Sequence, residues 1–210
     1  MSYLFSHFDE VAMRFGQHLS MTLLALAIAL LIALPLGILI TRIKRLERPV
    51  MAVLGILYTI PSLALLVLLI PIVGLGLKNA VIVLVIYAQV ILVRNIVVGL
   101  NGVEPAVVEA ARGMGMNGWQ RLLRVEMPLA LPIILAGIRI ATVTIIGIGA
   151  VAALINAGGI GRILFDGVSQ NNEQKIIAGS IAAAFLAGLA NTLLRLAERR
   201  VARVIYGEES

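Results

Sequence analysis

The sequence predicts an all-α membrane protein with five transmembrane helices. Hydrophobic residues make up 60% of the 210-residue chain, charged residues make up only 13%, and the mean hydropathy is +1.04. A water-soluble domain of this length needs far more polar surface. The apolar residues also gather into runs of about 20, the length that a helix needs to cross about 30 Å of hydrocarbon. Because lipid cannot satisfy free backbone groups, each run is expected to be helical.

Five segments meet this length criterion, and they cover residues 19–40, 50–73, 79–100, 129–154 and 176–194. The first carries no charge, whereas Arg94 lies near the end of the third and Arg139 lies within the fourth. Residues 1–18 contain two acids in place of the basic start of a secretory signal, so they are interpreted as an extracytoplasmic lead-in. Its histidines, His7 and His18, are expected to be solvated or interfacial. Residues 196–210 form a predicted cytoplasmic tail.

The placement of the 17 Lys and Arg residues predicts the orientation. Twelve of them flank the 41–49 loop, the 101–128 loop and the tail, four flank the opposite side, and Arg139 remains in the bilayer. Positive residues concentrate in cytoplasmic loops. The N-terminus is therefore predicted outside and the C-terminus in the cytoplasm. The net charge of +6 follows from this topology, so membrane lipids, and not nucleic acid, are the expected partners of the basic residues.

The cytoplasmic loop 101–128 contains a charged island between apolar spans. Glu104 and Pro105 are suited to begin a short helix, and Gly113 and Gly115 are suited to end it. Asn117, followed by Gln120, has the pattern of a capping box for a second helix that runs to Pro128. The sequence therefore predicts a helix–glycine–helix elbow across the membrane exit. Its first helix is marginal alone in water and is expected to settle into a partner's groove, where Glu109 meets an arginine.

This loop resembles the signature loop of permease subunits of binding-protein-dependent ABC importers, which reads E-A-A, three residues, G, nine residues, I-x-L-P. The chain matches it at Glu109, Ala110, Ala111, Gly115 and Pro128, with conservative departures at Val125 and Met127. Segments 58–64, 70–76 and 156–161 resemble osmoprotectant permeases for glycine betaine, carnitine or choline. The five-helix layout is also similar to the methionine-importer permease.

The resemblance implies a type I, MetI-like transmembrane domain in a prokaryotic inner membrane. It implies three kinds of protein partner: a cytoplasmic ATPase dimer that binds ATP and Mg²⁺, a second permease chain, identical or related, and an extracytoplasmic substrate-binding protein. This chain would hold no cofactor or metal itself. The residues expected to couple it to the ATPase are Glu109, Ala110, Ala111, Arg112, Gly113, Gly115 and Pro128.

Residues that could line a pathway are less sharply indicated. Pro61 and Ser62 break the second span near its middle, either to line the pathway or as a packing kink. Gln89 could touch substrate, although an interhelical hydrogen bond is favoured. Arg139 could face the pathway, or snorkel or pair with a carbonyl at the helix end. Arg94 is expected to snorkel.

A glycine-rich segment after the fourth span could form an outer gate, a docking surface for the binding protein or a plain interfacial loop. Its candidate residues are Gly158, Gly159 and Gly161. With one Trp, four Tyr and five Phe, the chain has few aromatic residues to cage a quaternary ammonium ion. Selectivity is therefore expected to reside mainly in the binding protein.

Catalysis by this chain is not expected. Gly113–Gly118 fits G-x-G-x-x-G but lacks the preceding strand of a dinucleotide site, and no phosphate-binding loop sequence occurs. The remaining alternatives are an importer for methionine or another amino acid, an ATP-independent carrier or channel, and a structural subunit. A carrier usually needs acids within the membrane, and the acids here fall in loops or flanks.

Overall fold

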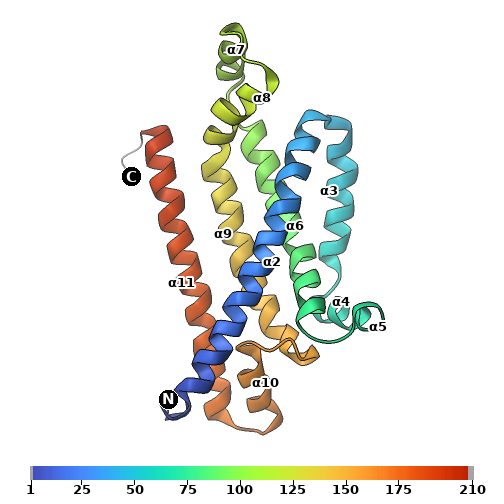
Figure 1. The fold of residues 1–210 in the computed structure, drawn as a ribbon, viewed down its shortest axis with the longest axis vertical. Coiled ribbons are helices and arrows are strands. Elements are labelled where there is room, and N and C mark those ends of the chain that lie inside the picture. The colour runs from blue at the N-terminus through green and yellow to red at the C-terminus, as the bar shows by residue number, and fades with distance from the viewer. Residues whose placement is uncertain (1, 208–210) are drawn as a thin grey trace.

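The computed structural model describes residues 2–207, and the regular elements in this range are helices (Figure 1). In chain order they are α1 (Ser2–Ser6), α2 (Phe8–Arg42), α3 (Lys44–Thr59), α4 (Ser62–Leu68), α5 (Ile70–Val73), α6 (Leu77–Asn101), α7 (Pro105–Gly113), α8 (Gly118–Arg121), a π-helical turn (Leu122–Glu126), α9 (Met127–Val151), a 3-10 turn (Ala152–Ile155), α10 (Gly161–Ser169) and α11 (Glu173–Tyr206).

Four helical stretches are long and apolar enough to cross a membrane. They contain α2, α6, α9 and α11, and the helices from α3 to α5 give a fifth if the bent pair is taken as one span. That pair bends by 91° between Thr59 and Ser62. Ile60 and Pro61 are extended there, and proline cannot donate the next helical hydrogen bond. The predicted all-α membrane fold is confirmed, and the break at Pro61 turns the chain aside instead of kinking a straight span.

The bundle is built around α6, the most deeply buried of the candidate spans. On α2, Ala25, Ala29 and Ala33 recur every four residues and are fully buried. Gly37 continues this face, and a Cβ added there would lie 2.5 Å from the Ile96 side chain on α6. On the other side, Gly137 of α9 leaves room for Asn95 of α6. Small residues let membrane helices approach closely, which compensates for the lack of a hydrophobic driving force in lipid.

The helices divide the molecule into two ends (Figure 1). One end carries α7, α8, the α2–α3 connection and the C-terminal end of α11. The other carries the N-terminal end and α10. The basic 41–49, 101–128 and tail segments therefore lie at one end of the bundle, as the charge distribution predicted.

Several predicted boundaries shift. The first long helix, α2, begins at Phe8, inside the predicted lead-in 1–18, and α11 continues into the tail as far as Tyr206. His18 is fully buried, with its Nε2 3.0 Å from the Ile146 carbonyl oxygen, so the solvated role expected for it was wrong. The reason is that α2 extends beyond its uncharged run and packs that end against α9 and the 156–161 turn.

Candidate functional site

The first helix of the elbow that follows α6 begins and ends where the sequence predicted. Pro105 opens α7, and a Schellman motif closes it. The Gly115 amide donates to the Arg112 carbonyl at 3.0 Å, and the Met116 amide donates to the Ala111 carbonyl at 3.2 Å. Gly115 has a φ of +81°, in the left-handed region that favours glycine. The cap fixes where α7 ends and turns the chain toward α8.

Most predicted coupling residues project from the elbow. Glu109, Ala110, Arg112 and Gly113 are exposed, whereas Ala111 is buried against the rest of the loop. Ala110 and Ala111 therefore differ in exposure, because successive residues on a helix point about 100° apart.

Large apolar side chains at this end are exposed as well. Met114 is 69% exposed and Trp119 is 66% exposed. They lie in the charged 101–128 loop, close to Arg112 and Arg121 in the sequence. Exposed aromatic and methionine side chains on a polar background mark protein interaction sites.

The second helix of the elbow begins with the predicted capping box. The Gln120 amide donates to Asn117 Oδ1 at 2.9 Å, and the Asn117 amide donates to Gln120 Oε1 at 3.0 Å. The prediction that this helix ends at Pro128 was wrong, because it continues through the π-helical turn into α9. Pro128 lies in the first turn of α9, directly after the π turn. Proline has no backbone N–H to donate, and the wider π-helical turn lets the helix continue without that hydrogen bond. The second half of the elbow, α8 and the π-helical turn, thus forms one continuous rod with α9.

A buried carboxylate joins this rod to α2. Glu126 is 5% exposed and accepts from two guanidinium groups. Arg42 Nη2 lies 2.6 Å from its Oε2, and Arg121 Nε lies 3.0 Å from its Oε1. Arg42 ends α2, and the other two residues belong to the elbow. We call this group the Glu126 clamp. It ties the 101–128 loop to the end of the first long helix, α2.

The helix break at Pro61 is supported by the neighbouring helix. The Tyr87 hydroxyl of α6 donates to the Ile60 carbonyl, which the break has freed. The Tyr87 and Tyr58 rings lie 5.5 Å apart with their planes tilted by 55°. Asn79 then holds the far side of the bend, donating to the carbonyls of Leu66 at 3.1 Å and Gly74 at 2.9 Å. Pro61 is exposed and Ser62 is partly buried.

The two polar residues of the mid-membrane region have partners within the bundle. Gln89 Nε2 donates to the Ala29 carbonyl of α2 at 3.0 Å, which is the interhelical bond that the sequence favoured. Arg139 pairs with Glu198 of α11 at 2.9 Å and donates to Asn191 at 3.2 Å. Neither alternative for Arg139 included this carboxylate. The pair forms because α11 continues as a helix beyond its apolar run and carries Glu198 alongside α9.

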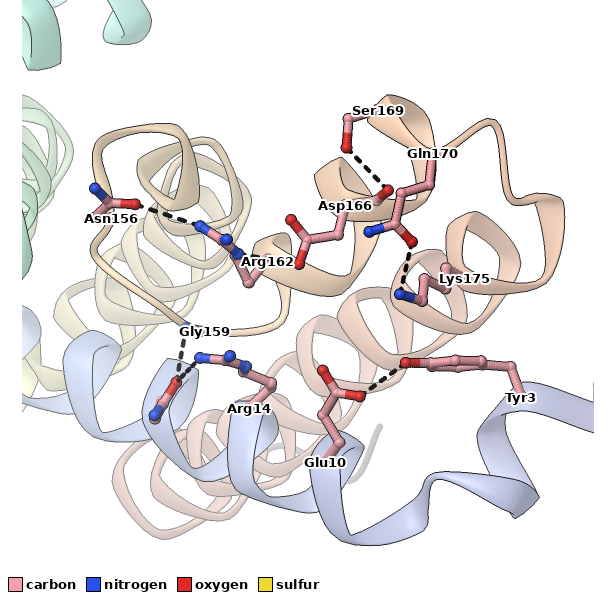
Figure 2. A network of polar contacts seen from close by, with 11 residues as sticks. Tyr3, Glu10, Arg14, Asn156, Gly159, Arg162, Asp166, Ser169, Gln170 and Lys175 are labelled. Atoms are coloured by element: carbon pink, nitrogen blue, oxygen red, sulfur yellow. Dashed lines mark hydrogen bonds and ion pairs between the residues drawn. The ribbon is translucent and has the colours of Figure 1, made fainter.

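The three glycines predicted as a gate lead into α10, which lies at the opposite end of the bundle (Figure 1). Gly159 takes part in a polar network there (Figure 2). Gly158 and Gly159 form a turn with φ of +80° and +79°, and the Gly159 amide donates to Gln17 Oε1 at 3.2 Å. Gly161 lies against the Ala150 carbonyl, where a Cβ would overlap it.

The same network holds the N-terminal helices. Tyr3 donates to Glu10 at 2.8 Å, and the Lys175 amine lies 5.5 Å from the Tyr3 ring centroid. Burial, followed by the hydrogen bond to Glu10, raises the pKa of Tyr3 to about 12. These contacts join α1, α2 and α11 at one end of the molecule.

The structure therefore separates the predicted residues into three regions. The coupling residues cluster at one end, the glycines lie at the other, and Pro61, Gln89 and Arg139 occupy different helix contacts between them. Sequence reasoning missed Met114, Trp119, Arg42 and Glu126. The two apolar residues could have been found as large side chains inside a polar loop. Nothing local distinguishes Glu126, which occupies the variable position of the loop signature.

Comparison with known proteins identifies the family. The chain is 36% identical over 201 residues to the glycine betaine/carnitine/choline transport system permease protein OpuCB of Bacillus subtilis (strain 168), covering 96% of this chain and 93% of that protein. It is 43% identical over 183 residues to the osmoprotectant import permease protein OsmW of Salmonella typhimurium, covering 85% of each.

A solved structure shares the fold. An inward-facing structure of the MetNI methionine ABC transporter has a chain with a TM-score of 0.81 and 27% identity, covering 89% of this chain and 93% of that one. Residues 29–205 match the family described as binding-protein-dependent transport system inner membrane component. The chain is a multi-pass membrane protein and belongs to this family of inner membrane transport components.

Proposed function

We propose that this chain is the membrane-spanning permease subunit of an ATP-driven importer for quaternary-ammonium compatible solutes such as glycine betaine, carnitine or choline. Two such chains, identical or related, form the pathway. A cytoplasmic ATPase dimer binds ATP and Mg²⁺, and an extracytoplasmic binding protein delivers the solute. The chain spans the inner membrane five times, with its N-terminus outside.

The observation that carries this proposal is the exposed elbow on a continuous rod. A short capped helix projects from the bundle with exposed Met114 and Trp119 beside it. After the Gly115 turn, α8 runs without interruption into α9, and Glu126 clamps this rod to α2. An elbow built in this way can transmit the movement of a bound partner to α9 and α2 together. The chain belongs to a family of binding-protein-dependent transport components, and this membership supports a partner subunit that hydrolyses ATP.

Transport then follows from a two-state bundle. ATP binding closes the ATPase pair, and closure moves the two elbows that the ATPases hold. Because each elbow is rigidly joined to α9 and tied to α2, the spans reorient together and the pathway opens outward. Hydrolysis releases the ATPases and the inward-facing arrangement returns. The ATPase acts only by favouring one of two arrangements of the same helices.

The substrate class rests on the relatives. The two sequence relatives named above, at 36% and 43% identity, carry names for glycine betaine, carnitine, choline or osmoprotectant transport. The methionine transporter matches at 27%. A methionine or other amino-acid importer is therefore the second candidate, favoured by the shared fold alone.

The test is co-purification of the ATPase with tagged permease, followed by uptake in proteoliposomes that also contain the binding protein. The variant Glu109→Lys reverses an exposed charge of α7 and is expected to lose both the ATPase and ATP-driven uptake. Glu173→Lys reverses an exposed charge at the opposite end and is expected to keep the ATPase bound. Uptake that persists without ATP, driven by an ion gradient, would indicate a carrier and contradict the proposal. Uptake of methionine in preference to quaternary ammonium solutes would establish the second candidate.

A further inference from the structure

A cavity of about 390 Å³ opens between α3, α6 and α9. Its lining includes Gly55 and Tyr58 of α3 and Arg94 and Asn95 of α6. These are segments of the apolar spans, so the cavity lies within the membrane region of the bundle. Its volume falls within the range of small-molecule sites.

The polar groups of this cavity do not match a lipid-facing surface. Arg94 is exposed and lies seven residues before the end of α6, about 10 Å along the helix axis. Within residues 2–207, no ion pair joins Arg94 to another side chain. A charge at such a depth is costly in hydrocarbon and ordinarily faces a partner or a water-filled cavity. Snorkelling was predicted for Arg94, but the cavity beside its side chain favours a position that faces the pathway.

Tyr58 supplies the second feature of the cavity. Its side chain is 42% exposed, and its ring is held by the tilted contact with Tyr87. Tyr87 is itself fixed by donating its hydroxyl to the Ile60 carbonyl at the helix break. The break thus positions one aromatic ring at the cavity wall. An aromatic face attracts quaternary ammonium groups.

From this arrangement we infer that the cavity is a transit site for zwitterionic quaternary ammonium solutes. The Tyr58 ring receives the trimethylammonium group, and the Arg94 guanidinium receives the carboxylate. The inference rests on the proposed function and adds to it a preference of the pathway for solutes that carry a carboxylate. Glycine betaine and carnitine carry both groups, whereas choline has a hydroxyl in place of the carboxylate. The pathway is therefore expected to favour the first two over choline.

One ring and one guanidinium in each chain make a weak site, which suits a step in transport. A solute must bind well enough to enter and weakly enough to leave. The chain has few aromatic residues, so selectivity is expected mainly in the binding protein. A weak site in the permease, which selects among solutes a second time, is consistent with this expectation.

The experiment uses the complete transporter in proteoliposomes, with binding protein saturated in turn by glycine betaine, carnitine and choline. Tyr58→Leu is expected to lower uptake of all three solutes about fivefold, the equivalent of one cation–π contact. Tyr58→Phe keeps the ring and is expected to retain most uptake.

Arg94→Gln is expected to lower the uptake ratio of glycine betaine to choline about fivefold, whereas Arg94→Lys keeps the charge and most of the ratio. Arg199→Gln removes an exposed arginine on α11 and is the matched control, with an unchanged ratio. Gly55→Leu places a side chain where a Cβ meets no atom within 4 Å, and it is expected to obstruct uptake of all three solutes.

An unchanged ratio in Arg94→Gln, or an equal loss of all solutes, would overturn the transit site, because snorkelling or packing does not discriminate between solutes. Full uptake by Tyr58→Leu would overturn it as well. If the wild-type transporter takes up none of the three solutes, the proposed function fails and the inference falls with it. The wild-type and variant measurements therefore separate the two failures.

Discussion

Glu126 is the residue whose importance depends most on the folded chain. Its carboxylate is almost fully buried, and it accepts from Arg42 and Arg121, the first of which is 84 residues away. Burying a carboxylate is unfavourable unless charged donors surround it. Two donors on different segments therefore hold the elbow in one position relative to α2. The loop signature gave no indication of this, because both neighbours of Glu126 belong to the signature and Glu126 does not.

We expect Glu126→Gln to weaken coupling more than it weakens folding. The change leaves two guanidinium groups without their carboxylate and destabilises the docked elbow by about 1–2 kcal/mol, discounted because Arg42 is 40% exposed. A loss of this size corresponds to about a tenfold fall in ATP-driven uptake, measured in proteoliposomes at equal permease content. Arg162→Gln breaks an exposed pair with Asp166 at the other end and is the control, with little effect expected. Equal uptake by both variants would rule out a coupling role for the clamp.

At the scale of the element, α7 is defined by its cap. The sequence located both ends of this helix, because Pro105 and Gly115 act through local backbone geometry that depends little on the rest of the fold. It did not locate the end of the following helix. A proline usually signals a helix boundary. Before Pro128, however, the π-helical turn lets the helix continue without the hydrogen bond that proline cannot donate.

Two glycines near the end of α7 offer a matched comparison. Gly115→Ala places a side chain at a φ of +81° and is expected to cost about 1–2 kcal/mol. The strain would displace the elbow and reduce the amount of ATPase that co-purifies. Gly113→Ala adds the same methyl group within the helix, into open space, and is expected to be neutral or slightly stabilising. Thermal unfolding of both variants measures the cost, and equal stability would show that the cap does not determine the end of α7.

At the scale of the whole molecule, the two ends of the bundle have different chemistry. One end holds the elbow and most of the basic residues. The other holds α10, the glycine turn and the polar network that joins α1, α2 and α11 (Figure 2). If the basic end is cytoplasmic, as the excess of Lys and Arg indicates, the elbow faces the ATPase and the glycine turn faces the binding protein.

This orientation can be tested directly because the chain contains no cysteine. Met114→Cys introduces an exposed thiol at the elbow, and Ser169→Cys introduces one on α10. A membrane-impermeant maleimide applied to cells whose outer membrane has been made permeable is expected to label Ser169→Cys at once. Met114→Cys is expected to react only after the inner membrane is opened. The reverse pattern would invert the topology and place the elbow out of reach of ATP.

By itself, the sequence determined the membrane class, the approximate spans, the predicted sidedness and the two ends of α7. Run length, charge placement and caps act over a few residues, so they can be read without the fold. Only the tertiary structure decided which polar residues meet. The partners of Glu126, Arg139 and His18 lie on other helices, and the cavity beside Tyr58 and Arg94 forms between three elements. These contacts depend on how the helices pack, because small residues at Gly37 and Gly137 set the close approach of neighbouring spans.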